Sequence, residues 1–426
     1  MKKIIFLLLA QIVFSQVEKN IGDFQELKVL DGINVILEKY RFYMLTDLDL
    51  LELSEFRREL HQYPELSGYE LETSKKILTA LEEMGPSQII DKMGGYGLAA
   101  IFDSQKKGPT ILFRAELDAL PIQEKNNLPW ASKLPGVSHT CGHDGHMTML
   151  LALGRVISRN PIKCGKVVLM FQPSEENGQG ARAVVSDARY KQIKPDLAFA
   201  IHIEPGRPFG YVSTRPGLIN CASLGLKITL NGKTAHAADP SDGISPSLAV
   251  AEFIQKISKF NHGDELNNNF RLTTVTHVQI GEQSFGISPG EASIFVTLRT
   301  SNDDSLSQLD KDVRELVSNI STKFKLTFDF EIFDHFAASI NDKEAHDIAV
   351  DAMKALNINY GSIGVPMRAS EDFGIFGKQS RAAMLCLGPG EDYAALHNPD
   401  YDFNDDLIPI GTGIFERITR DLLGTY

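Results

Sequence analysis

The densest group of residues that could do chemistry is the run 139–146, which reads HTCGHDGH. In an extended stretch, Cys141 and His143 would point to the same side, because the side chains of extended chain alternate. A thiolate and an imidazole on one side form half of a transition-metal site. Asp144 precedes an apolar helix and could cap it. Taken alone, the run would also fit a polar loop with one buried thiol and a capping aspartate.

Two adjacent carboxylates form a second group. Glu175 and Glu176 come shortly after the apolar run 167–171. Neighbouring side chains diverge, so one carboxylate could bind a metal while the other takes a proton from a water that the metal activates. Such a pair more often lies in a solvated acidic loop without a function. Its position at a strand end favours the functional interpretation here.

Four separate residues could complete a site. His202 ends a run of small apolar residues, where a lone histidine is more often a hydrogen-bonded core residue than a ligand. His397 lies in the segment LHNP, which could be an ordinary turn. His236 could stabilise a developing oxyanion or be an exposed loop residue. Arg299 ends an expected strand and could bind a substrate carboxylate bidentately or make a surface ion pair.

The elements that must position these residues are short apolar strands that alternate with helices. Strands are expected at residues 111–113, 167–171, 197–201 and 382–387, and helices at residues 47–60, 73–84 and 147–157. This alternation predicts an α/β sheet that is buried on both faces. Several of the candidate residues follow a strand end, which is where open α/β sheets bind their ligands.

Residues 215–333 follow a different order. The expected elements are strand 224–230, helix 246–257, strands 272–280 and 292–300, helix 305–324 and strand 326–332. This βαββαβ order is the ferredoxin-like signature. We therefore predict a discontinuous catalytic domain, residues 16–214 and 334–426, with a smaller domain, residues 215–333, inserted in it.

Composition limits the class of protein. The chain has 426 residues, a formal charge of −12 and four cysteines. The acidic balance argues against binding to nucleic acid, because that binding needs clustered Lys and Arg. Four cysteines in a chain of this length are too few for a disulfide scaffold.

The N-terminus has the layout of a secretory signal peptide. Met1, Lys2 and Lys3 precede an apolar run that ends at Phe14, and a cut after Ser15 fits the small-residue rule. The run is shorter than the ~20 residues that a membrane-spanning helix needs. We expect residues 1–15 to be removed and the mature protein to be exported, periplasmic or secreted, without stable membrane insertion.

Several motifs occur in order from about residue 50 to the C-terminus. They are 57–61 (RRELH) with 64–66 (PEL), 114–121 (RAELDALP), 139–146 (HTCGHDGH), 171–176 (FQPSEE), 200–202 (AIH), 232–236 (GKTAH) with Pro240, 370–373 (SEDF) and His397. Together they resemble the aminoacylase and carboxypeptidase family of dinuclear metallo-hydrolases (metallopeptidase family twenty). The similar branch contains hippurate hydrolases and the plant auxin-conjugate (indole-acetyl-amino-acid) hydrolases.

The resemblance implies a role for each candidate residue. Two divalent metal ions, manganese or zinc, would be bound by Cys141, His143, Glu176, His202 and His397. Glu175 would be the general base and then the general acid. His236 would contact the scissile carbonyl, in its own chain or from a partner subunit, and Arg299 would bind the substrate carboxylate.

The resemblance also implies a fold and an activity. The catalytic domain would be zinc-peptidase-like, a mixed sheet flanked by helices, and the inserted domain would be a ferredoxin-like dimerisation or lid domain of a homodimer. The enzyme would be a metal-dependent amidohydrolase that cleaves N-acyl amino acids to a carboxylic acid and an amino acid. An exported metallo-dipeptidase or carboxypeptidase is the alternative.

Three positions depart from the pattern of the family. Residues 286–289 read GISP, where relatives often carry Asn-Val-Ile-Pro, so an amide that helps to hold substrate is missing. Glu116 stands in place of a more usual aspartate, and Glu204 stands where an aromatic residue is common. None of these changes removes an expected metal ligand.

Overall fold

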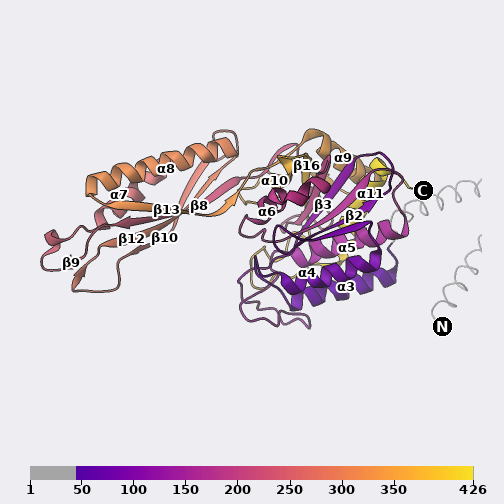
Figure 1. The fold of residues 1–426 in the computed structure, drawn as a ribbon, viewed down its shortest axis with the longest axis horizontal. Helices are drawn as coiled ribbons and strands as arrows, with labels where there is room; N and C mark the ends of the chain where they lie inside the picture. Colours follow the sequence, from indigo (N-terminus) through magenta and orange to yellow (C-terminus); the bar gives the residue numbers. More distant parts are fainter. Residues whose placement is uncertain (1–44, 426) are drawn as a thin grey trace, which may run out of the picture. The chain divides into compact units, whose positions relative to one another are not determined.

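The computed structural model describes residues 45–425 (Figure 1). The predicted signal peptide, residues 1–15, lies outside the described residues. The first elements are helices α3 (Asp47–Gln62) and α4 (Leu71–Met84), as the helical periodicity predicts. Among the described residues, no helix combines the length and the apolar character that a membrane crossing requires.

Within the described residues, eight strands form one mixed sheet in the order β1-β2-β4-β3-β5-β16-β6-β15. They are β1 (Gln88–Met93), β2 (Gly97–Asp103), β3 (Thr110–Glu116), β4 (Lys166–Gln172), β5 (Leu197–Ile203), β6 (Val212–Ser213), β15 (Tyr360–Gly361) and β16 (Arg381–Leu387). The four strands expected from the sequence are β3, β4, β5 and β16, which lie side by side and run parallel. Their carboxyl ends therefore meet at one edge of the sheet.

Each face of the large sheet is covered by its own helices. On one face, α5 (His143–Arg159) packs on β3, and α3, α4 and α11 (Ile408–Leu423) pack against α5. Nearly every residue of α5 is buried, which explains why its sequence is apolar on almost all sides. On the other face, α6 (Gly180–Ser186) packs on β4 and α10 (Gly374–Gly377) packs on β16. The expected burial of both faces is confirmed.

Within the same described range, a second sheet is antiparallel and has the strand order β10-β12-β8-β13. Its elements in chain order are β8 (Ala222–Asn231), α7 (Ser247–Ile257), β10 (Arg271–Ile280), β12 (Glu291–Thr300), α8 (Asp303–Phe324) and β13 (Thr327–Phe336). Both helices lie on one face of the sheet (Figure 1), over the alternating apolar residues of β8 and β12. The predicted ferredoxin-like order is confirmed.

Two short strands connect the sheets. β7 (Gly217–Asn220) leads into β8, β14 (Ser339–Asn341) follows β13, and the two pair antiparallel. β13 runs to Phe336, so the predicted end of the inserted domain at residue 333 falls inside a strand. The bounds of the two domains stay predictions.

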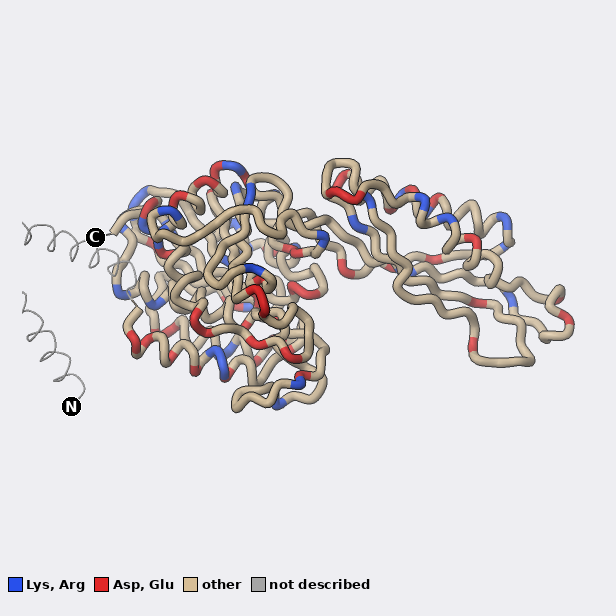
Figure 2. Tube along the Cα trace, turned by 180° about the vertical axis from the view of Figure 1, so that it is seen from behind, with Lys and Arg blue, Asp and Glu red and all other residues tan. Residues whose placement is uncertain are grey.

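Acidic and basic residues both occur along the helices α8 and α9 (Lys343–Ala355) (Figure 2). On α8, Arg314 pairs with Asp310 one turn away, and on α9 Lys343 pairs with Asp347 in the same way. The opposite side of α8 buries leucines and valines against the second sheet. These helices are therefore amphipathic, with their charged faces toward solvent.

The start of α5 differs from the prediction. The helix begins at His143, and Gly142 before it has a φ of 82°, so this segment turns and is not extended. Alternation of side chains is therefore the wrong reason for pairing Cys141 with His143. Asp144 does not cap the helix, because it is buried and accepts hydrogen bonds from Arg57 (3.3 Å) and from His61 (2.8 Å). These charge-assisted contacts stabilise Asp144 more than one backbone N–H would.

Candidate active site

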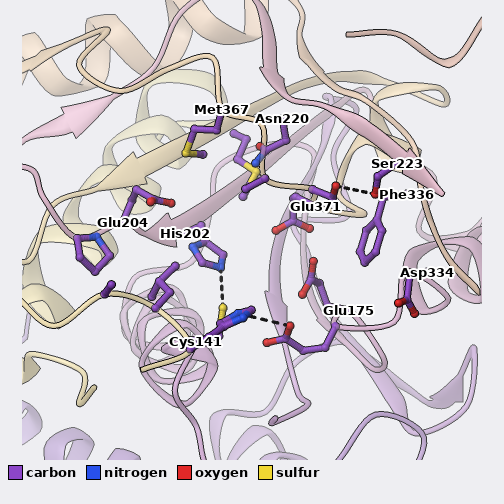
Figure 3. Close-up of a pocket in the computed structure, with 18 of the residues that line it drawn as sticks. Cys141, Glu175, His202, Glu204, Asn220, Ser223, Asp334, Phe336, Met367 and Glu371 are labelled. Carbon is purple, nitrogen blue, oxygen red and sulfur yellow. Dashed lines mark hydrogen bonds and ion pairs between the residues drawn. The ribbon is translucent and has the colours of Figure 1, made fainter. Parts of the chain in front are cut away.

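A cavity of about 690 Å³ opens where the central strands of the large sheet end. Six of the predicted site residues line it: Cys141, Glu175, Glu176, His202, Arg299 and His397. Figure 3 shows Cys141, His202 and Glu175 facing one another in this cavity. His143 does not line the wall, but its ring lies within ligand distance of Cys141 and His202.

Several of these residues lie at one edge of the sheet because they follow or end its parallel strands. His202 lies in β5, and Glu175 and Glu176 lie in the turn directly after β4. His397 lies in the loop after β16, with a φ of 65°, and its backbone N–H donates to the carbonyl of Thr140 (2.8 Å). That bond ties the loop after β16 to the turn before α5.

Five groups in the described part of the chain have ligand atoms within 4.8 Å of one another, and three overlapping ones consist only of predicted site residues. They are Cys141, His143 and His202; Cys141, Glu176 and His397; and His143, Glu175 and Glu176. Because Cys141 belongs to the first two groups, its sulfur can serve two neighbouring ion positions. Thiolate and imidazole are ligands that favour zinc, and imidazole and carboxylate also accept manganese.

Buried ligand atoms without a hydrogen-bond partner fit a bound cation. The Nδ1 atom of His143 bonds to the carbonyl of Asp118 (2.8 Å), while its Nε2 and the Oε1 atom of Glu176 are buried without a hydrogen-bond partner and lie 3.8 Å apart. The Nδ1 atom of His202 bonds to the next backbone carbonyl (2.7 Å), and its Nε2 faces the sulfur of Cys141 at 3.5 Å. A carbonyl on Nδ1 leaves Nε2 as the metal-binding nitrogen.

Burial and crowding of acids alter the proton affinity of the site. Burial raises the pKa of Glu175 well above its ordinary value, and Glu371 and Glu176 raise it further. Burial also raises the pKa of Glu176 to about 7, against the attraction of His143. The pKa of the Cys141 thiol is raised by burial and then by Glu176. A cation would reverse these shifts, so metal binding here is coupled to proton release.

Comparison with known proteins identifies the family. Residues 112–421 match the family model described as peptidase family M20/M25/M40. The chain belongs to this family. An N-acetyldiaminopimelate deacetylase of Exiguobacterium sibiricum is 28% identical over 86% of this chain and 98% of its own length. The IAA-amino acid hydrolase ILR1-like 5 of Arabidopsis thaliana is 30% identical over 86% of each chain.

A solved structure of the M20 family has the same fold. The YxeP protein of Bacillus subtilis, described as a dinuclear metal-binding peptidase, is 27% identical and superposes with a TM-score of 0.74. The match covers 89% of this chain and 100% of that one. The family resemblance and the fold class predicted from the sequence are therefore confirmed. This M20-family chain is an enzyme, a metal-dependent hydrolase of linear amide bonds.

Arg114 of this M20 hydrolase directly follows the expected strand 111–113, but no role in the site was predicted for it from the sequence. It is fully buried at the end of β3 and donates to Glu371 (2.8 Å) and Asp372 (2.6 Å), and it also pairs with Glu116. Glu371 lines the cavity, and with Asp372 it lies within 4.8 Å of a carboxylate oxygen of Glu175. The motifs RAELDALP and SEDF contain these residues, but 257 positions separate Arg114 from Glu371.

Arg299 of the M20 hydrolase is half-buried on the cavity wall. Its Nη1 donates to the carbonyl of Arg368 (2.8 Å) and to the hydroxyl of Ser370 (2.6 Å). Burial lowers its pKa, and no carboxylate among residues 45–425 pairs with it. The guanidinium is therefore available to a ligand carboxylate.

His236 lies away from the cavity of its own chain. β9 (Ala235–His236) pairs with β11 (Ile287–Ser288), and the Nδ1 atom of the exposed His236 accepts from the backbone N–H of Ala238 (3.1 Å). The residue is not part of the cavity wall. Within one chain, the structure thus does not bring His236 to the other predicted site residues.

Proposed function

We propose that this M20-family chain is a metal-dependent amidohydrolase that cleaves N-acyl amino acids to a carboxylic acid and an amino acid. The observation that carries the proposal is one cavity that joins the metal-ligand groups, the carboxyl of Glu175 and the guanidinium of Arg299. The names of the two sequence relatives, a deacetylase of an N-acetyl amino acid and an IAA-amino acid hydrolase, support it. The guanidinium suits the carboxylate of the leaving amino acid.

Two divalent ions would be held by the predicted ligands Cys141, His143, Glu176, His202 and His397. When bound, they would supply Lewis-acid activation of the carbonyl and of the attacking water. Thiolate and imidazole favour zinc, whereas imidazole and carboxylate also accept manganese. Titration of the metal-free protein with each ion would identify the one that restores turnover.

Glu175 would move the proton. Its carboxyl group faces the cavity beside the ligand groups, from which it can take a proton from the attacking water and give it to the leaving nitrogen. Arg299 would hold the far end of the substrate, so that the scissile amide lies between Glu175 and the ligand groups. The two residues would therefore divide proton transfer and substrate positioning between them.

A hydrolysis screen tests the proposal. Protein supplied with manganese or zinc is offered N-acetyl and N-benzoyl amino acids, the corresponding amino-acid amides and free dipeptides. We expect the acyl amino acids to exceed their amides in kcat/KM by about tenfold or more, because the amides lack the carboxylate for Arg299. Faster cleavage of dipeptides would identify the alternative, an exported dipeptidase or carboxypeptidase.

We also propose a homodimer through residues 215–333, in which His236 serves the cavity of the partner. Its exposure and its absence from the wall of its own cavity support this assignment. The variants Glu175→Gln and His236→Ala would each be inactive, and a dimer that contains one copy of each would regain one intact site. A verified mixed dimer without activity would exclude the assignment.

We propose export as well. The basic residues Lys2 and Lys3 before an apolar run support a cleaved signal. N-terminal sequencing of the protein from cell fractions would find Gln16 first in the exported fraction. Full-length protein confined to the cytoplasm would contradict export.

A further inference from the structure

Asn220 presents an unpaired amide to the cavity. It lines the wall but is only 3% exposed, and its Oδ1 atom is buried without a hydrogen-bond partner in the described part of the chain. Figure 3 shows Asn220 beside Met367, across the cavity from Cys141 and Glu175. An unpaired buried amide oxygen is unfavourable, so this atom at a substrate cavity indicates a ligand that supplies the missing hydrogen.

The backbone of Asn220 is held on two sides. As the last residue of β7, it pairs with Ser339 of β14 and forms a bridge with Met367. The N–H of the next residue, Cys221, donates to the carbonyls of Met367 (3.2 Å) and Ala369 (3.1 Å). The amide is therefore presented from a fixed backbone, as a residue that recognises a ligand requires.

The segment that holds Asn220 also holds Arg299. Arg299 donates to the carbonyl of Arg368 and to the hydroxyl of Ser370, which follow Met367 in the chain. Asn220 and Arg299 therefore lie on the same side of the cavity. This step rests on the proposed function: if Arg299 binds the carboxylate of the leaving amino acid, Asn220 faces the side chain of that amino acid.

The wall that Asn220 shares with two methionines offers apolar surface to a ligand. Met367 and Met384 supply flexible apolar surface, against which a charge would lose its hydration. Six carboxylates line the whole cavity, of which Glu175 and Glu176 belong to the candidate metal groups and two others have cationic partners. Glu204 pairs with Arg207 (3.4 Å), and Glu371 pairs with Arg114 (2.8 Å).

A carboxamide suits this position, because it offers both a donor and an acceptor to the amide of Asn220. We infer that Asn220 is a specificity-determining residue. It selects N-acyl amino acids whose side chain ends in a neutral hydrogen-bonding group, of which the carboxamide of glutamine is the best match.

Matched substrates test this assignment. N-acyl-glutamine and N-acyl-methionine have side chains of similar length, and only the first can hydrogen-bond fully with an amide. We expect the wild-type enzyme, with manganese or zinc and the same acetyl or benzoyl group on both substrates, to favour glutamine by about tenfold in kcat/KM. Asn220→Leu keeps the branched outline and the number of heavy atoms of the side chain, and should abolish the preference by raising KM for the glutamine substrate.

Control variants separate recognition from folding. Asn231→Leu changes an asparagine of β8 that is outside the cavity wall, and it should leave the preference unchanged. If Asn220→Leu does not fold, Asn220→Ser should show the same loss of preference, because its hydroxyl is too short to reach the ligand.

The outcomes distinguish this assignment from the proposed function. Equal kcat/KM for the two substrates in the wild type, or a preference that survives in the Asn220 variants, would overturn the assignment and leave the proposed function standing. No hydrolysis of any acyl amino acid by the metal-supplied wild type would overturn both.

Discussion

Glu175 is surrounded by more acidic than basic side chains. Glu176, Glu371 and Asp372 all raise its pKa after burial, and the guanidinium of Arg114 only partly opposes them. Such an environment favours the protonated carboxyl until a cation arrives nearby. Crowding therefore disfavours the charged carboxylates when no metal is bound, and it favours the binding of a cation that neutralises them.

Replacing Glu175 by glutamine keeps the size of the side chain and removes its ability to carry a proton. We expect kcat to fall by about 10²–10⁴-fold while the metal content is unchanged. Elemental analysis and turnover of the same sample measure both quantities. Glu176→Gln is the matched control, and it should lose metal because it removes a predicted ligand. Near-normal turnover of Glu175→Gln would remove this residue from the reaction.

His61 gives the stability a dependence on pH. Burial by itself would lower the pKa of His61, but Asp144 and Glu124 raise it from 6.5 to about 9. A raised folded-state pKa means that the charged ring stabilises the fold fully below pH 6.5. This contribution is lost as the pH rises through about 9.

Urea unfolding between pH 6 and pH 10 measures this contribution. We expect the free energy of unfolding to fall by up to about 3 kcal/mol over this range, and His61→Gln to flatten the fall. The exposed His262→Gln is the control and should keep the wild-type slope. An identical slope in the His61 variant would show that this ring does not carry the pH dependence.

At the scale of elements, the turn before α5 depends on glycine. Gly142 has a positive φ, and a Cβ atom built on it would lie 2.8 Å from the hydroxyl oxygen of Tyr401. Glycine permits this conformation without a steric penalty. The turn then brings Cys141 and His143 into one ligand group, although the chain is not extended between them.

Gly142→Ala should therefore weaken metal binding and lower kcat/KM by about tenfold or more, because the clash displaces the turn. Gly136→Ala is a matched control: its φ is 78°, and an added Cβ meets nothing within 4 Å. The control should lose about 1–2 kcal/mol of stability and keep its metal affinity. Calorimetric metal titration of both variants provides the comparison, and wild-type affinity in Gly142→Ala would contradict the role of this turn.

At the scale of the whole molecule, the ligand groups join segments that are distant in the chain. The predicted ligands come from the start of α5, the turn after β4, the end of β5 and the loop after β16. Ions bound to them would cross-link these segments in the native state. The second sheet, residues 222–336, contributes none of these ligands.

Removal of metal should lower the unfolding temperature. Binding to the native state adds about 4 kcal/mol of stability when free metal exceeds its Kd a thousandfold. Calorimetry with and without a chelator measures this change, and hydrogen exchange locates it. We expect faster exchange around residues 139–143 and 388–397, and unchanged exchange in the second sheet. Uniform changes over both sheets would contradict a local cross-link.

The sequence by itself determined the order of the elements and the residues that reach the site edge. Each of the four central strands and each element of the βαββαβ unit carries its own local apolar pattern. Because parallel strands end at one edge, Glu175, Glu176 and His202 could be assigned to one site before any contact was known. Motif order was enough to identify the family.

Only the tertiary structure decided which partners these residues have. Asp144 contacts Arg57 and His61 instead of capping its helix, and Arg114 holds acids that are more than 250 positions away. Likewise, the Oδ1 atom of Asn220 is buried without a hydrogen-bond partner on the cavity wall only because of the tertiary structure. The physical reason is that hydrophobic periodicity is a local property, whereas the burial and pairing of a polar group depend on segments that folding brings together.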